Sequence, residues 1–315
     1  MEDCQQNSQS EAKARKAKVS QKMSNYSDSF FDESNQNSSW YKVFEMIPPK
    51  SKLLDVGCSS GNFGEVLINK KNCLVDGVEP DARDAKVATS KLNKVWTLNI
   101  ETDDLSDLKN NYDFIYFGDV IEHLVNPIGT LTRIKPLLSK TGAVIFSIPN
   151  MGHVGVRLAL LKGEFEYTET GLTDKTHLHF YTMDEVQRVF AEAGYKIDKM
   201  DFVKKDYPKD VLKKYLNELG LIASPDFFKR MSQPDASAFQ FVGLARPAAA
   251  RRSKLKRFGP IDLFESLHED TKKNYEAQIN QLKSELEEAK NLLKHKSQHP
   301  YRAAAGHFRK KLKKT

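Results

Sequence analysis

The chain of 315 residues is 39% hydrophobic and 29% charged, which is enough for one α/β domain with polar extensions. Its three cysteines form neither a disulfide framework nor a metal-binding spacing, so a reducing cytoplasm is the expected compartment. The formal net charge of +7 is uneven, with two basic clusters late in the chain, and no run approaches the roughly 18 apolar residues of a membrane-spanning helix.

The first part of the chain divides into a polar tail and a short aromatic segment. Residues 1–25 are rich in Gln, Ser and Lys, which predicts a disordered tail without the apolar core of a secretory signal. Residues 26–47 predict two short helices that end before Pro48-Pro49. These helices either cover a pocket or pack on the edge of a sheet.

From Lys52 onward, short apolar runs alternate with helical segments, which is typical of a doubly wound sheet. We expect a domain over residues 26–247 with the α/β fold class: a Rossmann-like, seven-stranded, mostly parallel sheet with helices on both faces. Strands are predicted at 52–56, 74–78, 95–99, 113–118 and 142–148, and helices near 62–70, 82–91, 127–138 and 183–193. Later β-rich runs at 196–204 and 238–246 predict a closing hairpin, with a helical insert at 206–235 between them.

The composition changes after Pro247. Residues 248–260 predict a basic linker, and residues 261–296 predict a helix whose apolar positions follow the heptad spacing of a coiled coil. Such a coiled coil joins two copies of the chain or binds a different partner; the alternative is one amphipathic helix on its own domain. Residues 297–315 form a basic tail that either contacts an anionic membrane surface at the inner membrane face or stays solvated. The apolar seam consists of Tyr275, Ile279, Leu282, Leu286, Ala289 and Leu293.

The turn after the first predicted strand carries the chemistry. Asp55 ends the strand, Gly57 lets a ligand approach the backbone, and a helix begins just after Gly61. The glycine spacing does not match the G-x-G-x-x-G of dinucleotide-binding proteins. A carboxylate at Asp55 suits a ligand with an ammonium and a sulfonium group, and Glu79 at the next strand end can accept both hydroxyls of a ribose.

The segment Leu54–Gly61 resembles the first motif of the class I S-adenosylmethionine-dependent methyltransferases, especially their small-molecule and glycan branch. Gly77–Pro80 is similar to that family's ribose-binding strand end, and Asn99-Ile100 stands where the family often has Asp-Ile. Ser59 replaces a usual glycine, which is tolerable if its φ is negative. The resemblance implies S-adenosyl-L-methionine as the cofactor and the following cofactor-binding residues: Asp55, Gly57, Cys58, Gly61, Glu79, Asn99, Ile100 and Asp119.

Two later segments strengthen the resemblance. Phe117–Leu124 resembles the family's "DVLEHL" stretch, which implies that Asp119 lies beside the methyl donor and that His123 faces the acceptor. Thr176–Thr182 resembles a "H-x-R-F-[FY]-[ST]" segment, and Thr182 is a predicted N-cap with Glu185 three residues later.

A hydroxyl acceptor needs a base, and histidine titrates in the useful range. His123 and His177 are therefore the candidate catalytic residues, although each can instead be a structural, hydrogen-bonded histidine. No metal is expected, because we find no cysteine or carboxylate set in the sequence that completes a site with these histidines.

The acceptor class follows less directly from the sequence. The segment 151–172 is a substrate-lid region in the family, and its mixture of aromatic and acidic residues suits a sugar or a phenolic ring. We expect O-methylation of a sugar or glycan precursor, with a quinone-like or other aromatic acceptor as the alternative. A scaffold that binds the cofactor without turnover and acts through 261–296 also stays open. Nucleic-acid methylation is disfavoured, because the sequence has no Asn/Asp-Pro-Pro-aromatic motif.

Overall fold

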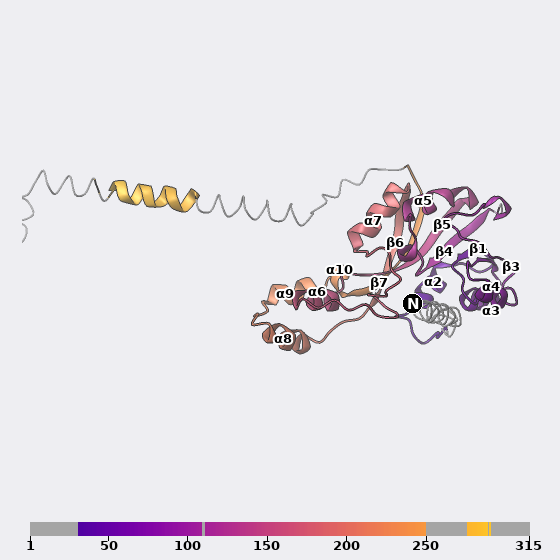
Figure 1. Ribbon diagram of the computed structural model, residues 1–315, viewed down its shortest axis with the longest axis horizontal. Coiled ribbons are helices and arrows are strands. Elements are labelled where there is room, and N and C mark those ends of the chain that lie inside the picture. Colours follow the sequence, from indigo (N-terminus) through magenta and orange to yellow (C-terminus); the bar gives the residue numbers. More distant parts are fainter. Residues whose placement is uncertain (1–30, 109–110, 250–275, 289, 291–315) are drawn as a thin grey trace, which may run out of the picture. The chain divides into compact units, whose positions relative to one another are not determined.

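The computed structural model describes residues 31–108, 111–249, 276–288 and 290, and the chain divides into two units, Met1–Lys254 and Leu255–Thr315. The first unit contains a seven-stranded sheet in the order β3-β2-β1-β4-β5-β7-β6 (Figure 1). The first five strands are parallel, whereas β7 runs antiparallel to both β5 and β6. The strands are β1 (Lys52–Val56), β2 (Leu74–Val78), β3 (Lys94–Trp96), β4 (Tyr112–Gly118), β5 (Leu138–Pro149), β6 (Tyr195–Lys204) and β7 (Ala238–Pro247).

Helices cover both faces of the sheet, because strand side chains alternate between two buried layers. Leu54 and Val56 of β1 belong to the layer that α7 covers, whereas Leu53 belongs to the layer covered by α2 and α3. The predicted α/β fold is therefore confirmed. The helices are α2 (Ser39–Met46), α3 (Asn62–Lys71), α4 (Ala82–Ala88), α5 (Pro127–Arg133), α6 (Val154–Leu161), α7 (Met183–Glu192), α8 (Lys209–Glu218), α9 (Pro225–Met231) and α10 (Pro234–Ser237).

The N-cap of α7 fixes the segment that leads to the site. The Thr182 hydroxyl accepts a hydrogen bond from the Glu185 N–H at 3.5 Å, as the sequence predicted. Val186, Val189 and Phe190 then form one buried stripe on the helix. This packing anchors the chain immediately after residues 176–181 on the sheet.

Several element boundaries differ from the prediction. Strand β3 ends at Trp96, because the Asn99 side chain accepts the Glu101 N–H at 2.8 Å and turns the chain away from the sheet. Helix α5 ends at Arg133, and a 3₁₀ turn that contains Pro136 leads into β5, since proline cannot continue an α-helical hydrogen-bond ladder. Residues 31–47 contain one helix, α2, rather than two; residues 26–30 lie outside the described residues.

The predicted insert at 206–235 contains α8, α9 and the start of α10, which ends at Ser237. Helix α8 packs against α6 through Leu212 and Leu216, which meet Val154 and Leu158 in a small apolar cluster separate from the sheet. The insert is therefore attached to the segment that follows β5.

The second unit is described only in part. Residues 276–288 and 290 are helical, and Ile279, Leu282 and Leu286 of the predicted seam are exposed there. The rest of 261–296, the tails 1–25 and 297–315, and residues 250–260 of the linker lie outside the described residues. Among the described helices, none combines the length and apolar character needed to cross a membrane.

Candidate functional site

A cavity of about 690 Å³ lies where the carboxyl ends of β1, β2 and β4 meet. This is the edge at which parallel α/β sheets bind ligands. Five of the predicted cofactor-binding residues line it: Asp55, Gly57, Cys58, Glu79 and Asp119. Helix α2 and its N-cap residue Ser38 close one side with Ser38, Ser39 and Trp40, while Val43 and Met46 of the helix pack in the core. The aromatic segment thus both covers the pocket and packs on the sheet.

Glycines shape the turn between β1 and α3. Gly57 has φ 73°, and its N–H donates to the Val78 carbonyl at 2.8 Å. A Cβ at Gly57 would lie 2.6 Å from Cγ2 of Val120. Gly61 has φ 77° and is the N-cap residue of α3. It does not line the cavity, and it sets the direction of the helix whose N-terminus supplies the next lining residues, Asn62 and Phe63.

Ser59 adopts φ 47°, so the expectation of a negative φ is wrong. Its N–H donates to Oε2 of Glu79 at 2.8 Å, and its hydroxyl contacts Oδ2 of Asp84 at 3.4 Å. These two hydrogen bonds hold a conformation that side chains rarely adopt. Oε1 of Glu79 accepts the Asp81 N–H at 2.9 Å. Glu79 therefore ties together the turns after β1 and β2 while its carboxylate borders the cavity.

The cavity is strongly acidic. The residues that line it contribute one guanidinium, Arg83, which pairs with Asp81 at 2.9 Å. Burial and the neighbouring Glu79 raise the pKa of Asp55 to about 8, and burial also raises the pKa of Glu79. A positively charged ligand would stabilise these carboxylates, as expected for an ammonium and a sulfonium group. The acids that line the cavity are Asp32, Asp55, Glu79, Asp81, Asp84 and Asp119.

Asp119 lies at the end of β4 in a backbone conformation with φ 54°. Its Oδ1 accepts hydrogen bonds from the Ser147 hydroxyl at 3.2 Å and from the Gln240 side-chain amide. Burial raises the pKa of Asp119, and the hydrogen bonds and nearby His123 oppose that rise. Strands β5 and β7 thus fix the orientation of a carboxylate that faces the cavity.

Asn99 and Ile100 lie elsewhere. Ile100 is buried in the core, and Asn99 is exposed with its side-chain oxygen hydrogen-bonded to the Glu101 N–H. Neither residue lines the cavity. Trp40, Phe63 and Tyr116 also line the cavity, although no sequence motif singled them out. Their side chains form an aromatic wall, in which the ring centroids of successive members are 5.2 Å apart. A run of aromatic residues before the first strand was the available signal for Trp40.

The two candidate catalytic histidines meet, although they are far apart in the sequence. The ring centroids of His123 and His177 are 4.8 Å apart. Backbone hydrogen bonds join their segments, since the N–H groups of Leu178 and His179 donate to the Glu122 carbonyl at 2.9 and 3.1 Å. Burial and then the proximity of His123 lower the pKa of His177. His177 is therefore neutral near pH 7 and can accept a proton.

Glu122 lies beside this histidine pair and was missed as a site residue. Its side chain is 0% exposed, and Oε1 is 4.0 Å from Nε2 of His177. Burial and then Asp119 raise the pKa of Glu122 well above its usual value. The available signal was its position directly before His123 in the segment Phe117–Leu124.

The segment 151–172 contains α6 and an exposed aromatic group. The Phe165 ring lies 5.2 Å from that of Tyr167 and 6.0 Å from that of Phe180, centroid to centroid. All three side chains are at least 40% exposed. Because Phe180 follows His177 by three residues, this aromatic group belongs to the same surface region as the histidine segment.

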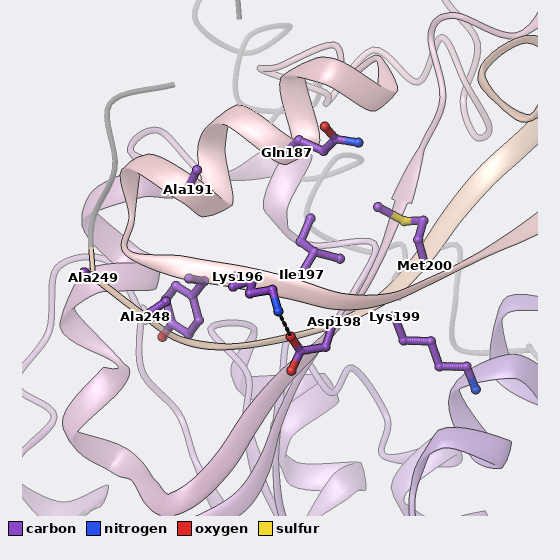
Figure 2. Close-up of a pocket in the computed structure, with 10 residues that line it drawn as sticks. Gln187, Ala191, Lys196, Ile197, Asp198, Lys199, Met200, Ala248 and Ala249 are labelled. Carbon is purple, nitrogen blue, oxygen red and sulfur yellow. Dashed lines mark ion pairs between the residues drawn. The ribbon is translucent and has the colours of Figure 1, made fainter. Parts of the chain in front are cut away.

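A second cavity, of about 710 Å³, lies between α7 and the edge strand β6 (Figure 2). Gln187 and Ala191 reach it from α7, and Ile197 and Met200 reach it from β6. Lys196 and Asp198 pair with each other at 3.5 Å. Among the described residues that line it, Asp198 is the one carboxyl group, whereas six carboxyl groups line the first cavity, so the second cavity lacks the acidic character of the first.

A protein-family model described as "Methyltransferase domain" matches residues 30–200, more than half of the chain. The chain is similar to a ubiquinone biosynthesis O-methyltransferase of Cereibacter sphaeroides, with 25% identity over 151 residues, 45% of this chain and 59% of that protein. A protein with the same description from Dinoroseobacter shibae is 25% identical over 158 residues, 48% of this chain and 63% of that protein. The chain thus spans less than two thirds of the length of these relatives.

Solved structures with a similar fold are more distant in sequence. A SAM-dependent methyltransferase from Archaeoglobus fulgidus is 14% identical, covers 68% of this chain and 94% of its own, and has a TM-score of 0.46. A TehB-like SAM-dependent methyltransferase from Corynebacterium glutamicum is also 14% identical, covers 76% and 99%, and has a TM-score of 0.42.

Proposed function

The chain belongs to the class I S-adenosylmethionine-dependent methyltransferases, and we propose that it methylates a hydroxyl group of a small molecule. S-adenosyl-L-methionine is the cofactor. The observation that carries the proposal is the position of Asp119, which borders the acidic cavity and lies within electrostatic reach of His123. A methyl donor in the cavity and a proton acceptor beside it are the two requirements of O-methylation.

The cofactor has a proposed place for each of its parts. Asp55 pairs with the methionine ammonium, Glu79 accepts the ribose hydroxyls, and Asp119 lies beside the methionine portion. The backbone of Gly57 and Cys58 borders the ligand, and Gly61 directs the N-terminus of α3 toward it. Asn99 and Ile100 lie just beyond β3 and outside the cavity, so their proposed contact with the adenine requires that the adenine extend past the lining residues. The acidity of the cavity supports this orientation, because the ligand brings two positive charges near buried carboxylates.

The reaction itself is an in-line displacement. A lone pair of the acceptor oxygen forms the new O–CH₃ bond, and the S–CH₃ bond breaks with its electron pair left on sulfur, which becomes a neutral thioether. The hydroxyl proton passes to His123 or His177. Hydrogen bonds hold both rings, since Nδ1 of His123 lies 3.1 Å from the Thr176 carbonyl and Nδ1 of His177 lies 3.3 Å from the Leu172 carbonyl. With Nδ1 protonated in each ring, Nε2 is the atom that accepts the proton.

An aromatic acceptor is the better supported substrate class. The exposed rings of Phe165, Tyr167 and Phe180 offer faces for stacking, and the relatives are described as O-methyltransferases of ubiquinone biosynthesis. The sugar or glycan acceptor expected from the sequence has no support in these relatives. We therefore propose a phenol- or quinol-like hydroxyl, with the polyhydroxy sugar as the outcome that a direct assay can reveal.

The direct assay uses the full chain and methyl-labelled cofactor with two acceptor panels, phenols and quinols in one and nucleotide sugars in the other. We expect the wild-type chain to transfer label to the phenol panel. Replacing the histidine that acts as the base, by His123→Ala or His177→Ala, should reduce the label at least about 100-fold. Both variants should keep the cofactor affinity of the wild type. His179→Ala is the matched control, because its ring is not paired with either histidine. Label in the sugar panel alone would contradict the aromatic acceptor. Cofactor binding without transfer to either panel or to fractionated cell extract would favour the scaffold.

The C-terminal unit is the proposed partner-binding element. The exposed Ile279, Leu282 and Leu286 on the described helix support a coiled coil over 261–296, formed with a second copy or with another helix. Light scattering of the full chain tests the homodimer: Leu282→Asp together with Leu286→Asp should reduce a dimeric mass to that of one chain. Membrane contact by 297–315 is a separate proposal, tested by co-sedimentation with anionic vesicles.

A further inference from the structure

Glu122 is in an unusual environment for a carboxyl group. Its side chain is completely buried, and neither carboxyl oxygen has a hydrogen-bond partner among the described residues. Burying such a group without a partner is costly, so buried carboxyl groups are normally hydrogen-bonded, paired or bound to a metal. The buried carboxyl group of Glu122 is therefore expected to have a hydrogen-bonding, ionic or metal partner in addition to the described residues.

The neighbouring histidine rings leave one suitable atom each. Because carbonyl oxygens accept only from a protonated nitrogen, the Thr176 and Leu172 carbonyls place the proton of His123 and of His177 on Nδ1. Nε2 of each ring then carries a free lone pair. Metal-binding histidines in proteins commonly have this arrangement, with the second nitrogen donating to a backbone carbonyl.

These three side chains form a compact group of potential ligand atoms. One atom from each of Glu122, His123 and His177 lies within 4.8 Å of the other two. The expectation that no carboxylate completes a metal site with these histidines is therefore wrong, because the fold places Glu122 beside them. Two histidines and one carboxylate are the donors of known catalytic zinc and iron sites, which leave at least one position open.

A direct hydrogen bond between Glu122 and His177 does not account for the arrangement. The distance of 4.0 Å from Oε1 to Nε2 exceeds that of a hydrogen bond, and such a bond would leave the other carboxyl oxygen of Glu122 without a partner. A metal ion accepts all three donors at once. The backbone hydrogen bonds from Leu178 and His179 to the Glu122 carbonyl already hold the two segments together.

We propose that Glu122, His123 and His177 bind a divalent transition-metal ion, with Zn²⁺ as the best match. Imidazole nitrogens favour Zn²⁺ and related ions, whereas Mg²⁺ prefers an octahedral set of oxygens. The role of the ion rests on the proposed function. Its open position takes the acceptor hydroxyl and lowers the pKa of that hydroxyl, so that the proton leaves to solvent and the oxygen attacks as the anion. The histidines then act as ligands rather than as bases.

The binding test uses the full chain after removal of metal with a chelator. Titration with Zn²⁺ by calorimetry, and with Co²⁺ by its visible absorption, should reveal one site that Mg²⁺ does not fill. Glu122→Gln and His177→Asn should each weaken Zn²⁺ binding at this site at least about tenfold. His179→Asn is the control with unchanged affinity. Other histidines and cysteines of the chain contribute equally to Zn²⁺ binding by the wild type and by the variants. The difference in Zn²⁺ binding between the wild type and a variant therefore measures this site.

Two further measurements keep the outcomes separate. Cofactor affinity and circular dichroism identify a variant that has failed to fold. If one of the variants fails to fold, the Zn²⁺ affinities of Glu122→Gln, which keeps the size of the side chain, and of His123→Asn are compared instead. Equal Zn²⁺ and Co²⁺ binding by wild type and by folded variants would overturn the metal site. Full methyl transfer by the metal-free chain would overturn the role of the ion while the proposed function stands. A bound metal without transfer to any hydroxyl acceptor would overturn the proposed function while the metal site stands.

Discussion

The substitution Gly57→Ala tests whether the loop after β1 is shaped by two separate constraints. Gly57 combines a φ of 73° with a position where a Cβ would lie 2.6 Å from Cγ2 of Val120. Gly163 has a similar φ of 78°, and a Cβ added there would meet no atom within 4 Å. Gly163→Ala therefore isolates the backbone cost, and Gly57→Ala adds the steric cost.

The two constraints differ in expected size. A left-handed backbone costs an ordinary residue about 1–2 kcal/mol, and the reduced entropy of the unfolded alanine chain offsets about 0.4–1 kcal/mol of it. Gly163→Ala should thus lower the free energy of unfolding by about 1 kcal/mol. Overpacking against Val120 adds about 1–3 kcal/mol at Gly57, for a total of about 3 kcal/mol.

A double-mutant cycle separates the two costs. Val120→Ala removes both methyl groups, so the variant with both substitutions should recover about 2 kcal/mol relative to the sum of the single changes. Urea unfolding of the four proteins in the cycle, followed by circular dichroism, measures this coupling. If Gly57→Ala costs no more than Gly163→Ala, or if the cycle shows no coupling, the steric argument is refuted. Cofactor titration of the same proteins shows whether the loop must keep this shape to bind its ligand.

Two further predictions concern the same cavity. Asp55, with a pKa of about 8, is mostly protonated at neutral pH, and in the proposed binding mode it must ionise to pair with the cofactor ammonium. Cofactor binding should therefore release a proton, and the affinity for the cofactor should increase as pH rises toward about 8. Calorimetry in two buffers of different ionisation enthalpy should show this release for the wild type and none for Asp55→Asn. Ser59→Gly should raise the free energy of unfolding by up to about 1 kcal/mol in urea, because glycine adopts a φ of 47° without strain. A loss of stability would mean that the Ser59 hydroxyl contributes more through Asp84 than the backbone strain costs.

The sequence predicted the sheet well because its central strands are buried on both faces and therefore read as short, nearly continuous apolar runs. All seven predicted strands exist, and the strand ends that carry Asp55, Glu79 and Asp119 meet at one edge, as parallel topology requires. The predicted ends of β3 and α5 were wrong, because single residues interrupt the backbone hydrogen bonding there while the apolar pattern of the sequence continues. The Asn99 side chain ends β3, and Pro136 ends the helical pattern after α5, and neither effect changes the apolar periodicity.

The histidine site shows a different limit of sequence reasoning. His123 and His177 could each be proposed from a motif, but their distance depends on how the chain returns to the sheet edge after α6 and the segment 151–172. The backbone hydrogen bonds from Leu178 and His179 to Glu122 decide that geometry, and they involve main-chain atoms that leave no residue-type signal. Glu122 was visible in the sequence as an acid before a histidine. Its complete burial, which distinguishes it from a solvated carboxylate, emerges only from the packing.

The charges of the cavity bear on turnover as well as on binding. Six lining carboxyl groups face a cofactor that carries a sulfonium, whereas the product of methyl transfer has a neutral sulfur. Buried carboxylates such as Asp55 and Glu79 gain more from the cation than solvated ones, because the interior screens charge weakly. In the proposed binding mode, the product retains its ammonium near Asp55 and loses the sulfonium near Asp119. The same electrostatics that hold the cofactor therefore favour its exchange for the product after each transfer, and substitutions at Asp119 should narrow the difference between the two affinities more than substitutions at Asp55.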